Sequence, residues 1–397
     1  MAICSRIWNF VIFLLSLYIY LEFAKQHKLV MKEKLFPEPP NNSRDNSSEF
    51  RPLKIPPPPF PIRPIFLSAK SQLLEETDHL SHPLDYDFYR HSCPKAERIV
   101  RTVVQHLHRV RPDVAPALLR LIFHDCFVQG CDASVLLDPS DEIDSEKESL
   151  PNLTLRGFDL IDIIKSKLEE ECPGIVSCAD VLVLAARDSV ALSGGPFYPV
   201  YTGRRDSVAA YSNLARDVLP SPHDNISLLL HTFASRGFDE KETVSLFAAH
   251  SIGVIRCKFF KDRLYDFNRS QEPDPSMDPE LVPLLRTKCH KRRSVSSPES
   301  QPCSCDFSTE EEPGILMNHE GSAFGTQYYH SILQGRGILY TDQQLMAAEA
   351  TGNWVRAYAA DAFLFRRDFA LTMMKLSDLR VLTAPTGQIR FSCSKVA

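Results

Sequence analysis

One stretch of the chain, residues 120–134, brings together side chains that can carry out acid–base chemistry. Arg120 and His124 lie four residues apart in a segment, 115–127, whose apolar spacing predicts a helix, so the two side chains share one face. An imidazole can take up and return a proton near neutral pH, and a fixed guanidinium stabilises developing negative charge. The pair therefore suits a reaction of a small polar molecule such as a peroxide.

Oxygen donors follow the histidine in a pattern that suits a calcium ion. They are two carboxylates, one hydroxyl and two backbone carbonyls, from Asp125, Val128, Gly130, Asp132 and Ser134. Ca²⁺ prefers hard oxygen ligands of this kind. Each feature alone would fit a helix that ends in an acidic loop, but the acid–base pair, the oxygen donors and the closely spaced Cys126 and Cys131 together favour a functional site.

The composition narrows the class of protein. With 397 residues, of which 44% are hydrophobic, the chain can bury one large core or two medium ones. A net charge of -5 without a basic stripe, and the lack of a glycine-rich phosphate loop, argue against nucleic acid and nucleotides as partners. Eleven cysteines without paired Cys-x-x-Cys motifs favour disulfides formed in an oxidising compartment over a zinc site.

Two segments precede the predicted folded domain, which comprises residues 83–397. Residues 1–35 contain an uncharged apolar run, 7–21, and a basic flank, and both a cleaved signal peptide and an uncleaved signal anchor fit this pattern. Residues 36–82 are rich in Pro, Asn and Ser and include four consecutive prolines, which predicts an extended linker. Glycosylation sequons occur at Asn41, Asn46, Asn225 and Asn268.

The domain is predicted to be all-α. Helix-like apolar spacing recurs in seven segments: 97–110, 115–127, 158–171, 179–192, 226–235, 240–249 and 353–374. Alternation typical of strands is scarce, and breaks that contain Pro and Gly, such as 194–196, separate the segments. We therefore expect helices throughout and very little β structure.

Six further motifs follow in a fixed order along the chain. They are Phe88-Tyr-Arg-His-Ser-Cys-Pro94, Val176-Ser-Cys-Ala-Asp180, Gly203-Arg-Arg-Asp-Ser207, Ala249-His-Ser-Ile-Gly253, Asp262-Arg-Leu-Tyr265 and Gly387-Gln-Ile-Arg-Phe-Ser-Cys393. Together with residues 120–134 they resemble the class III (secretory plant) haem peroxidases. The resemblance implies an all-α haem peroxidase fold whose distal and proximal lobes enclose haem b.

The same resemblance implies an activity and a location. The enzyme would reduce hydrogen peroxide and oxidise phenolic or other small aromatic donors in one-electron steps, in the response to oxidative stress or in lignin-type phenol oxidation. It would enter the secretory pathway and reach the cell wall or the vacuole, as a monomer. Residues 1–35 would add attachment to a membrane if they remain uncleaved.

On the distal side of the haem, the resemblance assigns an acid–base network. His124 would exchange protons with hydrogen peroxide, Arg120 would stabilise the charge of the breaking O–O bond, and Asn152 would orient the imidazole. For this reason the sequon at Asn152 is placed in the pocket. Glu146 would extend the network through its carboxylate, although it also fits a solvated acid in an acidic loop.

The resemblance also assigns the axial ligand and the walls of the pocket. His250 would bind the haem iron, with Asp342 accepting its ring N–H, although Asp342 also fits the N-cap of a helix. Phe123 would wall the distal pocket and Phe259 would pack on the proximal side. Pro196 would border the channel for aromatic donors, although a proline in a turn needs no function.

Structural features of the family follow as well. Four disulfides are implied, Cys93–Cys172, Cys126–Cys131, Cys178–Cys393 and Cys257–Cys289, which leave Cys4, Cys303 and Cys305 over. An internal ion pair is implied between Asp180 and one arginine of the Arg204-Arg205 pair.

The family binds a second calcium ion on the proximal side, and here that site is expected to be degraded. Ser251 is a remnant of it. Alignment on the segment 324–329 places Met317, Glu320 and Gly325 at positions where the family has two aspartates and a threonine. Because too few oxygen ligands remain, we expect one calcium ion per chain, in the distal loop.

Two other classes of function fit parts of the sequence. A membrane-anchored haem-binding scaffold, catalytically weak or inactive, would use the N-terminal segments and the altered calcium site. A calcium-binding adhesion module would use only residues 125–134 and would leave His250 and Asp342 unexplained. The complete set of Arg120, His124 and Asn152 favours the peroxidase.

Overall fold

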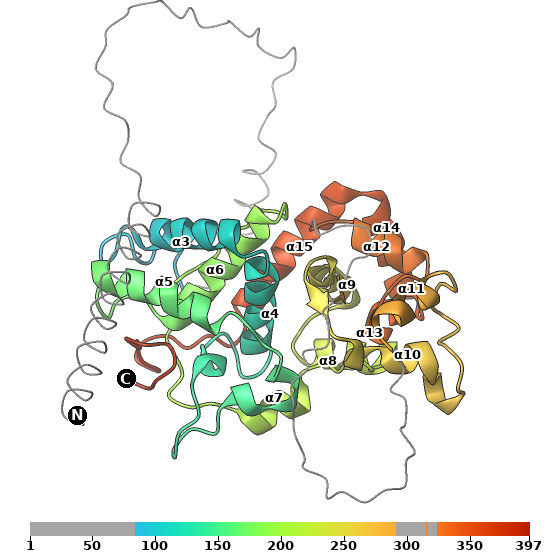
Figure 1. The fold of residues 1–397 in the computed structure, drawn as a ribbon. Helices are drawn as coiled ribbons and strands as arrows, with labels where there is room; N and C mark the ends of the chain where they lie inside the picture. Colours follow the sequence, from blue (N-terminus) through green and yellow to red (C-terminus); the bar gives the residue numbers. More distant parts are fainter. Residues whose placement is uncertain (1–83, 291–314, 317–323) are drawn as a thin grey trace, which may run out of the picture. The chain divides into compact units, whose positions relative to one another are not determined.

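Helices account for nearly all of the regular structure in the residues that the computed structural model describes, 84–290, 315–316 and 324–397 (Figure 1). These residues lie in one folded unit, His79–Ala397. The predicted all-α class is confirmed. The predicted leader (1–35) and linker (36–82), together with Cys4, Cys303 and Cys305, lie outside the described ranges. None of the helices within these ranges is long and apolar enough to cross a membrane.

The α-helices follow one another along the chain. They are α3 (Ala96–Val110), α4 (Val114–Cys126), α5 (Phe158–Glu171), α6 (Cys178–Leu192), α7 (Ser212–Val218), α8 (Ile226–Ala234), α9 (Glu240–Phe247), α10 (Lys261–Tyr265), α11 (Leu281–Lys288), α12 (Gln327–Leu333), α13 (Tyr340–Gln344), α14 (Glu349–Ala360) and α15 (Ala362–Ser377). Single 3-10 turns are η1 (Ser134–Leu136), η2 (Glu146–Glu148), η3 (Leu150–Asn152), η4 (Ala248–Ser251), η5 (Cys257–Phe259) and η6 (Phe267–Arg269). Two short strands, β1 (Val254–Ile255) and β2 (Ile315–Leu316), pair antiparallel.

Six of the seven predicted helices begin and end within two residues of the expected positions, whereas the segment 353–374 was wrongly predicted as one helix. The structure divides this segment between α14 and α15 at Asp361, whose backbone is extended (φ -132°, ψ 100°). The carboxylate of Asp361 accepts from the backbone N–H groups of Phe363 and Leu364 and so caps α15. Apolar periodicity continues through this break, which is why spacing alone did not reveal it.

Helix α6 forms the centre of the distal half of the fold. Its residues from Cys178 to Val190 are all buried, and α3 and α4 pack against it. Ser177 begins the helix, because its hydroxyl accepts from the backbone N–H of Asp180 at 3.1 Å. Helix α4, which packs against α6, carries Arg120 and His124.

The proximal half is built around α9. A capping box between Asp239 and Glu242 begins this helix, which packs against α14 and α15 and delivers His250 in the turn η4. The two halves meet where Gly253 crosses the first turn of α4. A Cβ atom at Gly253 (φ +100°) would lie 2.9 Å from Cβ of Pro116, so this close approach requires glycine.

Four disulfides join the described residues, and they are the pairs that the resemblance implies. Cys178–Cys393 closes the longest loop, with a sequence separation of 215, and the chain-entropy model assigns about 4–5 kcal/mol to such a loop. Cys126–Cys131 spans only 5 residues and therefore acts on the local shape of the loop after His124. Cys93–Cys172 and Cys257–Cys289 complete the set.

A buried ion pair ties the start of α6 to the segment around residue 204. Asp180 and Arg204 are fully buried, and Nη1 of Arg204 donates to Oδ1 of Asp180 at 2.9 Å. The other oxygen, Oδ2, accepts from the hydroxyl of Tyr89 at 2.6 Å and from two backbone N–H groups, those of Gly203 and Arg204. The structure thus assigns the expected ion pair to Arg204 and gives it a structural role.

Asp180→Ala is expected to lower the free energy of unfolding by about 3–5 kcal/mol, because it leaves a buried arginine without its main counterion. Glu170→Ala is the control, since Glu170 pairs with Lys167 at the surface and its loss should cost at most about 1 kcal/mol. Urea unfolding of the disulfide-intact proteins measures both. Equal effects of the two substitutions would contradict this assignment.

Candidate active site

Arg120 and His124 lie on one face of α4, as their spacing predicts. The Nε–H of Arg120 donates to Nε2 of His124, with the two nitrogens 3.3 Å apart. His124 is 8% exposed, and the next residue, Asp125, is buried in the last turn of the helix. The fold therefore brings the cation and the imidazole together, with the imidazole buried and the guanidinium partly open to solvent.

Asn152 fixes the orientation of the His124 ring. Nδ1 of His124 lies 2.6 Å from Oδ1 of Asn152, and Nδ2 of the same amide donates to the backbone carbonyl of Glu146 at 2.8 Å. Because a carbonyl can only accept, the amide must turn its oxygen toward the histidine. Nδ1 therefore carries the ring proton and Nε2 is unprotonated. The lone pair of Nε2 accepts the N–H of Arg120 in this structure and is the atom that can take up a proton.

Glu146 takes part in this network through its backbone. Its side chain is fully buried and accepts from the backbone N–H of Tyr211 at 3.1 Å, so it is no solvated acid. Burial raises the pKa of the Glu146 carboxyl to about 7. The expected contact through the carboxylate is therefore replaced by one through the carbonyl, which holds Asn152 in η3 against η2.

The surroundings of His124 keep its imidazole neutral. Burial, and then the charge of Arg120, lower the pKa of His124 to about 3, although the hydrogen bond to Asn152 acts in the opposite direction. At any pH well above this value, Nε2 is unprotonated and can act as a base.

Arg120 is anchored by a loop that the sequence did not single out. Its guanidinium donates to the backbone carbonyls of Pro151 and Thr154 and to the hydroxyl of Thr154, each at 3.0 Å. Part of the surface of Arg120 is open to solvent. Desolvation by the surrounding protein, and then the charge of Arg256, lower the pKa of Arg120 to about 10. The group therefore stays positively charged at neutral pH, in a fixed position beside His124.

A second histidine, His250, is held by a carboxylate in the same manner. Its Nδ1 donates to Oδ1 of Asp342 at 2.8 Å, because a carboxylate can only accept. This leaves the lone pair of His250 on Nε2, and the side chain is 35% exposed. An imidazole with one nitrogen anchored and the other free is suited to bind a metal such as haem iron.

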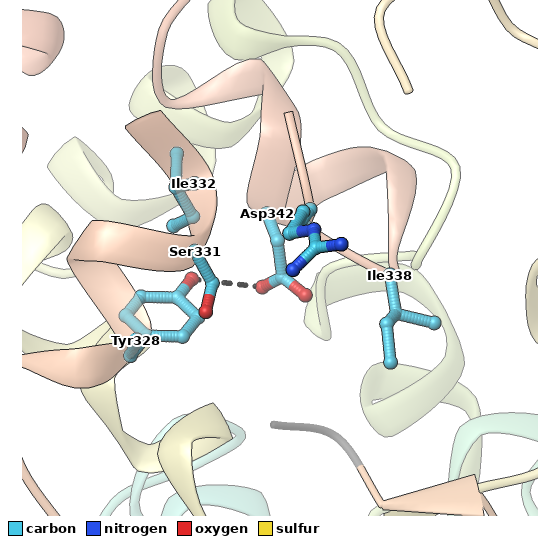
Figure 2. Close-up of a pocket in the computed structure, with 7 residues that line it drawn as sticks. Tyr328, Ser331, Ile332, Ile338 and Asp342 are labelled. Atoms are coloured by element: carbon cyan, nitrogen blue, oxygen red, sulfur yellow. Dashed lines mark hydrogen bonds between the residues drawn. The ribbon is translucent and has the colours of Figure 1, made fainter. Parts of the chain in front are cut away.

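Tyr328 is a residue of this site that sequence reasoning missed. Its hydroxyl donates at 2.8 Å to the same oxygen, Oδ1 of Asp342, and Figure 2 shows the phenol and the carboxylate turned toward each other. Burial and the charge of Asp342 raise the pKa of Tyr328 well above its ordinary value, so the hydroxyl stays protonated. The only signal in the sequence was the pair Tyr328-Tyr329, which alone does not indicate its partner.

Asp342 also supports the helix that carries it. Its Oδ2 accepts from the backbone N–H of Leu339 at 3.3 Å, which places Asp342 at the third position of α13 with Leu339 as the N-cap. The alternative of an N-cap at Asp342 was therefore wrong. The cavity beside it in Figure 2, about 10 Å³ in volume, has room for about one water molecule and for no organic substrate.

Aromatic rings line both histidines. Phe123 stacks on Phe127 with ring centroids 4.6 Å apart and meets His124 edge-on at 6.0 Å, as expected of a distal wall. On the proximal side the ring that packs on His250 is that of Phe247, at 5.5 Å. Phe259 packs against an apolar cluster around η5, α10 and α11, and its packing on the proximal side of the haem stays a prediction.

Pro196 is buried, whereas the next residue, Phe197, is 58% exposed. Arg366 holds this turn by donating to the backbone carbonyls of Gly194 and Gly195 at 2.6 and 2.9 Å. The side chain that this turn offers to solvent is therefore Phe197, over which the guanidinium of Arg187 lies at 5.2 Å.

The loop after His124 has the character of a calcium site. Asp125 accepts the backbone N–H of Ala133 through Oδ2 at 3.0 Å, while its Oδ1 is buried without a hydrogen-bond partner among the described residues. Burial and the charge of Asp132 raise the pKa of Asp125, and burial raises that of Asp132 to about 6. Negative charge is thus concentrated where a cation would remove the repulsion.

The remaining oxygen donors of this loop are partly engaged. The carbonyl of Val128 accepts from Arg236 at 3.0 Å, and that of Gly130 accepts from the backbone of Asp132 at 2.9 Å, so each keeps one lone pair for a metal. Ser134 is fully buried. In the part of the chain that the structure describes, no three His, Cys, Asp or Glu side chains group around a metal position.

Ser251, expected as the remnant of the proximal calcium site, is buried, and its hydroxyl has no hydrogen-bond partner among the described residues. Gly325 contributes no side chain, and Met317 and Glu320 lie outside the described ranges. The described portion of this region therefore offers one hydroxyl and no carboxylate at the positions in question.

Comparisons with known proteins agree with this geometry. A model of the peroxidase family matches residues 100–361. The Arabidopsis thaliana protein named "Putative Peroxidase 48" is 50% identical over 79% of this chain and 82% of its own length. Peroxidase 28 and Peroxidase 57 of the same plant are 40% and 41% identical over 78% of this chain and 92% and 91% of their own lengths. The chain belongs to the plant secretory haem peroxidase family, and it is a hydrogen-peroxide-dependent peroxidase.

Asn152→Asp is expected to shift the acid limb of the reaction with hydrogen peroxide to higher pH. A carboxylate beside Nδ1 favours the imidazolium and so raises the pKa of His124 from about 3, and protonated His124 cannot accept a proton. Stopped-flow rate constants of the haem-loaded protein as a function of pH measure the shift. Asn213→Asp, at an exposed position, should leave the profile unchanged, and an equal shift in both variants would contradict the role of Asn152.

Proposed function

We propose that His250 is the axial ligand of haem b and that hydrogen peroxide reacts on the other face, beside His124 and Arg120. The supporting observation is that each histidine is anchored through Nδ1, which leaves Nε2 unprotonated at both. Haem, when bound, supplies the redox centre through which two electrons reach the peroxide. The residues of the chain supply the ligand, the proton transfers and the fixed positive charge.

His124 is the acid–base residue in this proposal. Its Nε2 takes the proton from the first oxygen of hydrogen peroxide and returns it to the second oxygen, which leaves as water. Arg120 stabilises the negative charge that develops as the O–O bond breaks. The low pKa of His124 supports both steps, because a neutral base accepts the proton and an acidic imidazolium releases it readily.

Asp342 and Tyr328 act together on the axial ligand. The carboxylate of Asp342 accepts the N–H of His250 and gives the imidazole partial imidazolate character, which favours high oxidation states of a bound metal. Tyr328 donates to the same carboxylate oxygen and withdraws part of that electron density. The balance of these two hydrogen bonds sets the basicity of the ligand.

Phenols and other small aromatic compounds are the proposed donors, which each return one electron. The exposed ring of Phe197 beside Pro196 offers them an apolar surface. We also infer from the N-terminal sequence that the protein is exported to the cell wall or the vacuole, or held at a membrane. From membership of the family we infer that it acts as a monomer in phenol oxidation under oxidative stress.

His124→Leu is expected to slow the reaction with hydrogen peroxide by about 10²–10⁴-fold, because it removes the acid–base group. The change of the Soret band of haem-loaded protein after mixing with peroxide measures the rate, and guaiacol oxidation measures turnover. His231→Leu replaces an exposed histidine of α8 and should leave both rates unchanged. Wild-type protein whose Soret band does not respond to peroxide would refute the proposed function.

One calcium ion per chain is expected, bound by Asp125, Val128, Gly130, Asp132 and Ser134. Removal of calcium with a chelator should lower the melting temperature, since a ligand of the folded state stabilises it by mass action. Metal analysis of desalted protein gives the count, and Asp132→Asn should reduce it below one. Two tightly held ions per chain would contradict the loss of the proximal site.

A further inference from the structure

Four aromatic rings form a continuous path from the proximal site to the surface. The ring centroids of Tyr328 and Tyr329 on α12 are 5.2 Å apart, and Tyr329 lies 5.3 Å from Tyr358 on α14. Tyr358 in turn lies 5.7 Å from Trp354, one helical turn away. Rings at these separations are in van der Waals contact.

The two ends of this path differ in their surroundings. At the inner end, the hydroxyl of Tyr328 donates to Asp342, which also accepts from His250, and both distances are 2.8 Å. At the outer end, Trp354 is partly exposed, whereas the three tyrosines are buried. The path therefore leads from the proposed axial ligand to an indole that solvent can reach.

Two of the tyrosines have a partner that can accept a proton. Tyrosine oxidation in a protein interior requires the phenol to give up its proton, because a phenol radical cation is strongly acidic. Tyr328 donates to Asp342, and Tyr358 donates to the buried carboxylate of Asp368 at 3.2 Å. Tyr329 donates to the backbone carbonyl of Val244 at 3.0 Å, which takes no proton, so its ring serves as a bridge.

We propose that Trp354 is a second oxidation site, at which donors too large to enter the haem pocket give up electrons. This inference rests on the proposed peroxidase function. Hydrogen peroxide accepts two electrons and two protons and forms two molecules of water, and the electrons leave the indole of Trp354 one at a time through the ring path. Each electron is replaced by one from a donor at the surface, whose phenolic proton passes to solvent, so two donors are oxidised per peroxide.

The surroundings of Trp354 define the class of donor. The ammonium group of Lys241, at the start of α9, lies 5.9 Å from the centre of the indole ring. A positive charge there raises the potential of the indole, which makes its oxidised form a stronger oxidant, and it attracts acidic groups. The donor that fits is an electron-rich aromatic polymer that carries carboxylate or sulfonate groups.

Ordinary packing is the competing explanation, because the same rings fill the core between α12, α14 and α15. Packing alone predicts no oxidation of Trp354 by peroxide. Oxidation by simple accessibility predicts instead that exposed tyrosines react first. Tyr86, which is 42% exposed and packs 4.4 Å from Tyr201, provides the internal comparison.

Radical trapping tests the path directly. Haem-loaded full-length protein is mixed with one equivalent of peroxide and a nitroso spin trap without donor, and the adducts are located by peptide mass spectrometry. We expect the adduct on Trp354, and we expect Tyr358→Phe, which keeps the ring but removes the oxidisable hydroxyl, to lower its yield several-fold. Adducts confined to Tyr86 and Tyr201, or a yield unaffected by Tyr358→Phe, would overturn the path.

A comparison of two donors tests the function of the site. Trp354→Phe should lower kcat/KM for a sulfonated lignin polymer by about tenfold or more and leave that for guaiacol within about twofold. Equal losses for both donors, or no loss for the polymer, would overturn the inference while leaving the peroxidase function intact. If wild-type protein oxidises neither donor, the proposed function fails and the inference fails with it.

Discussion

Both histidines of the site are held through Nδ1 by an oxygen that can only accept, and the rest of the site depends on this constraint. Asn152 holds His124, and Asp342 holds His250. Each acceptor stands on a separate element, η3 or α13, from the histidine that it orients. The unprotonated Nε2 atoms therefore keep their direction only while the packing between these elements is intact.

The difference between the two acceptors explains the difference between the two histidines. An uncharged amide beside a buried ring, with Arg120 close by, leaves His124 neutral with a pKa of about 3, which suits proton exchange. A carboxylate beside His250 increases the electron density of the ring, which suits a metal ligand. The roles proposed for the two rings therefore differ in part because the neighbour of His250 carries a charge, whereas burial and Arg120, with an uncharged amide beside the ring, keep His124 neutral.

The oxygen-rich loop after His124 is mechanically connected to the distal site. Asp125 follows His124 directly, and Glu146, whose carbonyl holds Asn152, lies close enough to add to the repulsion on Asp125. A cation bound by Asp125 and Asp132 would relieve that repulsion and stabilise the turns η1 to η3. If a cation binds in this loop as proposed, its binding and the orientation of His124 would be coupled through a few shared residues.

The sequence by itself determined the all-α class, six of the seven helix segments, and the placement of Arg120 and His124 on one face, because local periodicity and spacing carry this information. Motif resemblance added Asn152, His250, Asp342 and the four disulfides, which spacing alone could not have paired. Only the tertiary structure revealed Tyr328 as a partner of Asp342, the anchoring of Arg120 by Thr154, the burial of Pro196 and the break at Asp361. The break at Asp361 is local, but the apolar periodicity that continues across it hides it. Contacts between segments distant in the chain decide the other features, and a pattern read along one segment contains no record of the residues that pack against it.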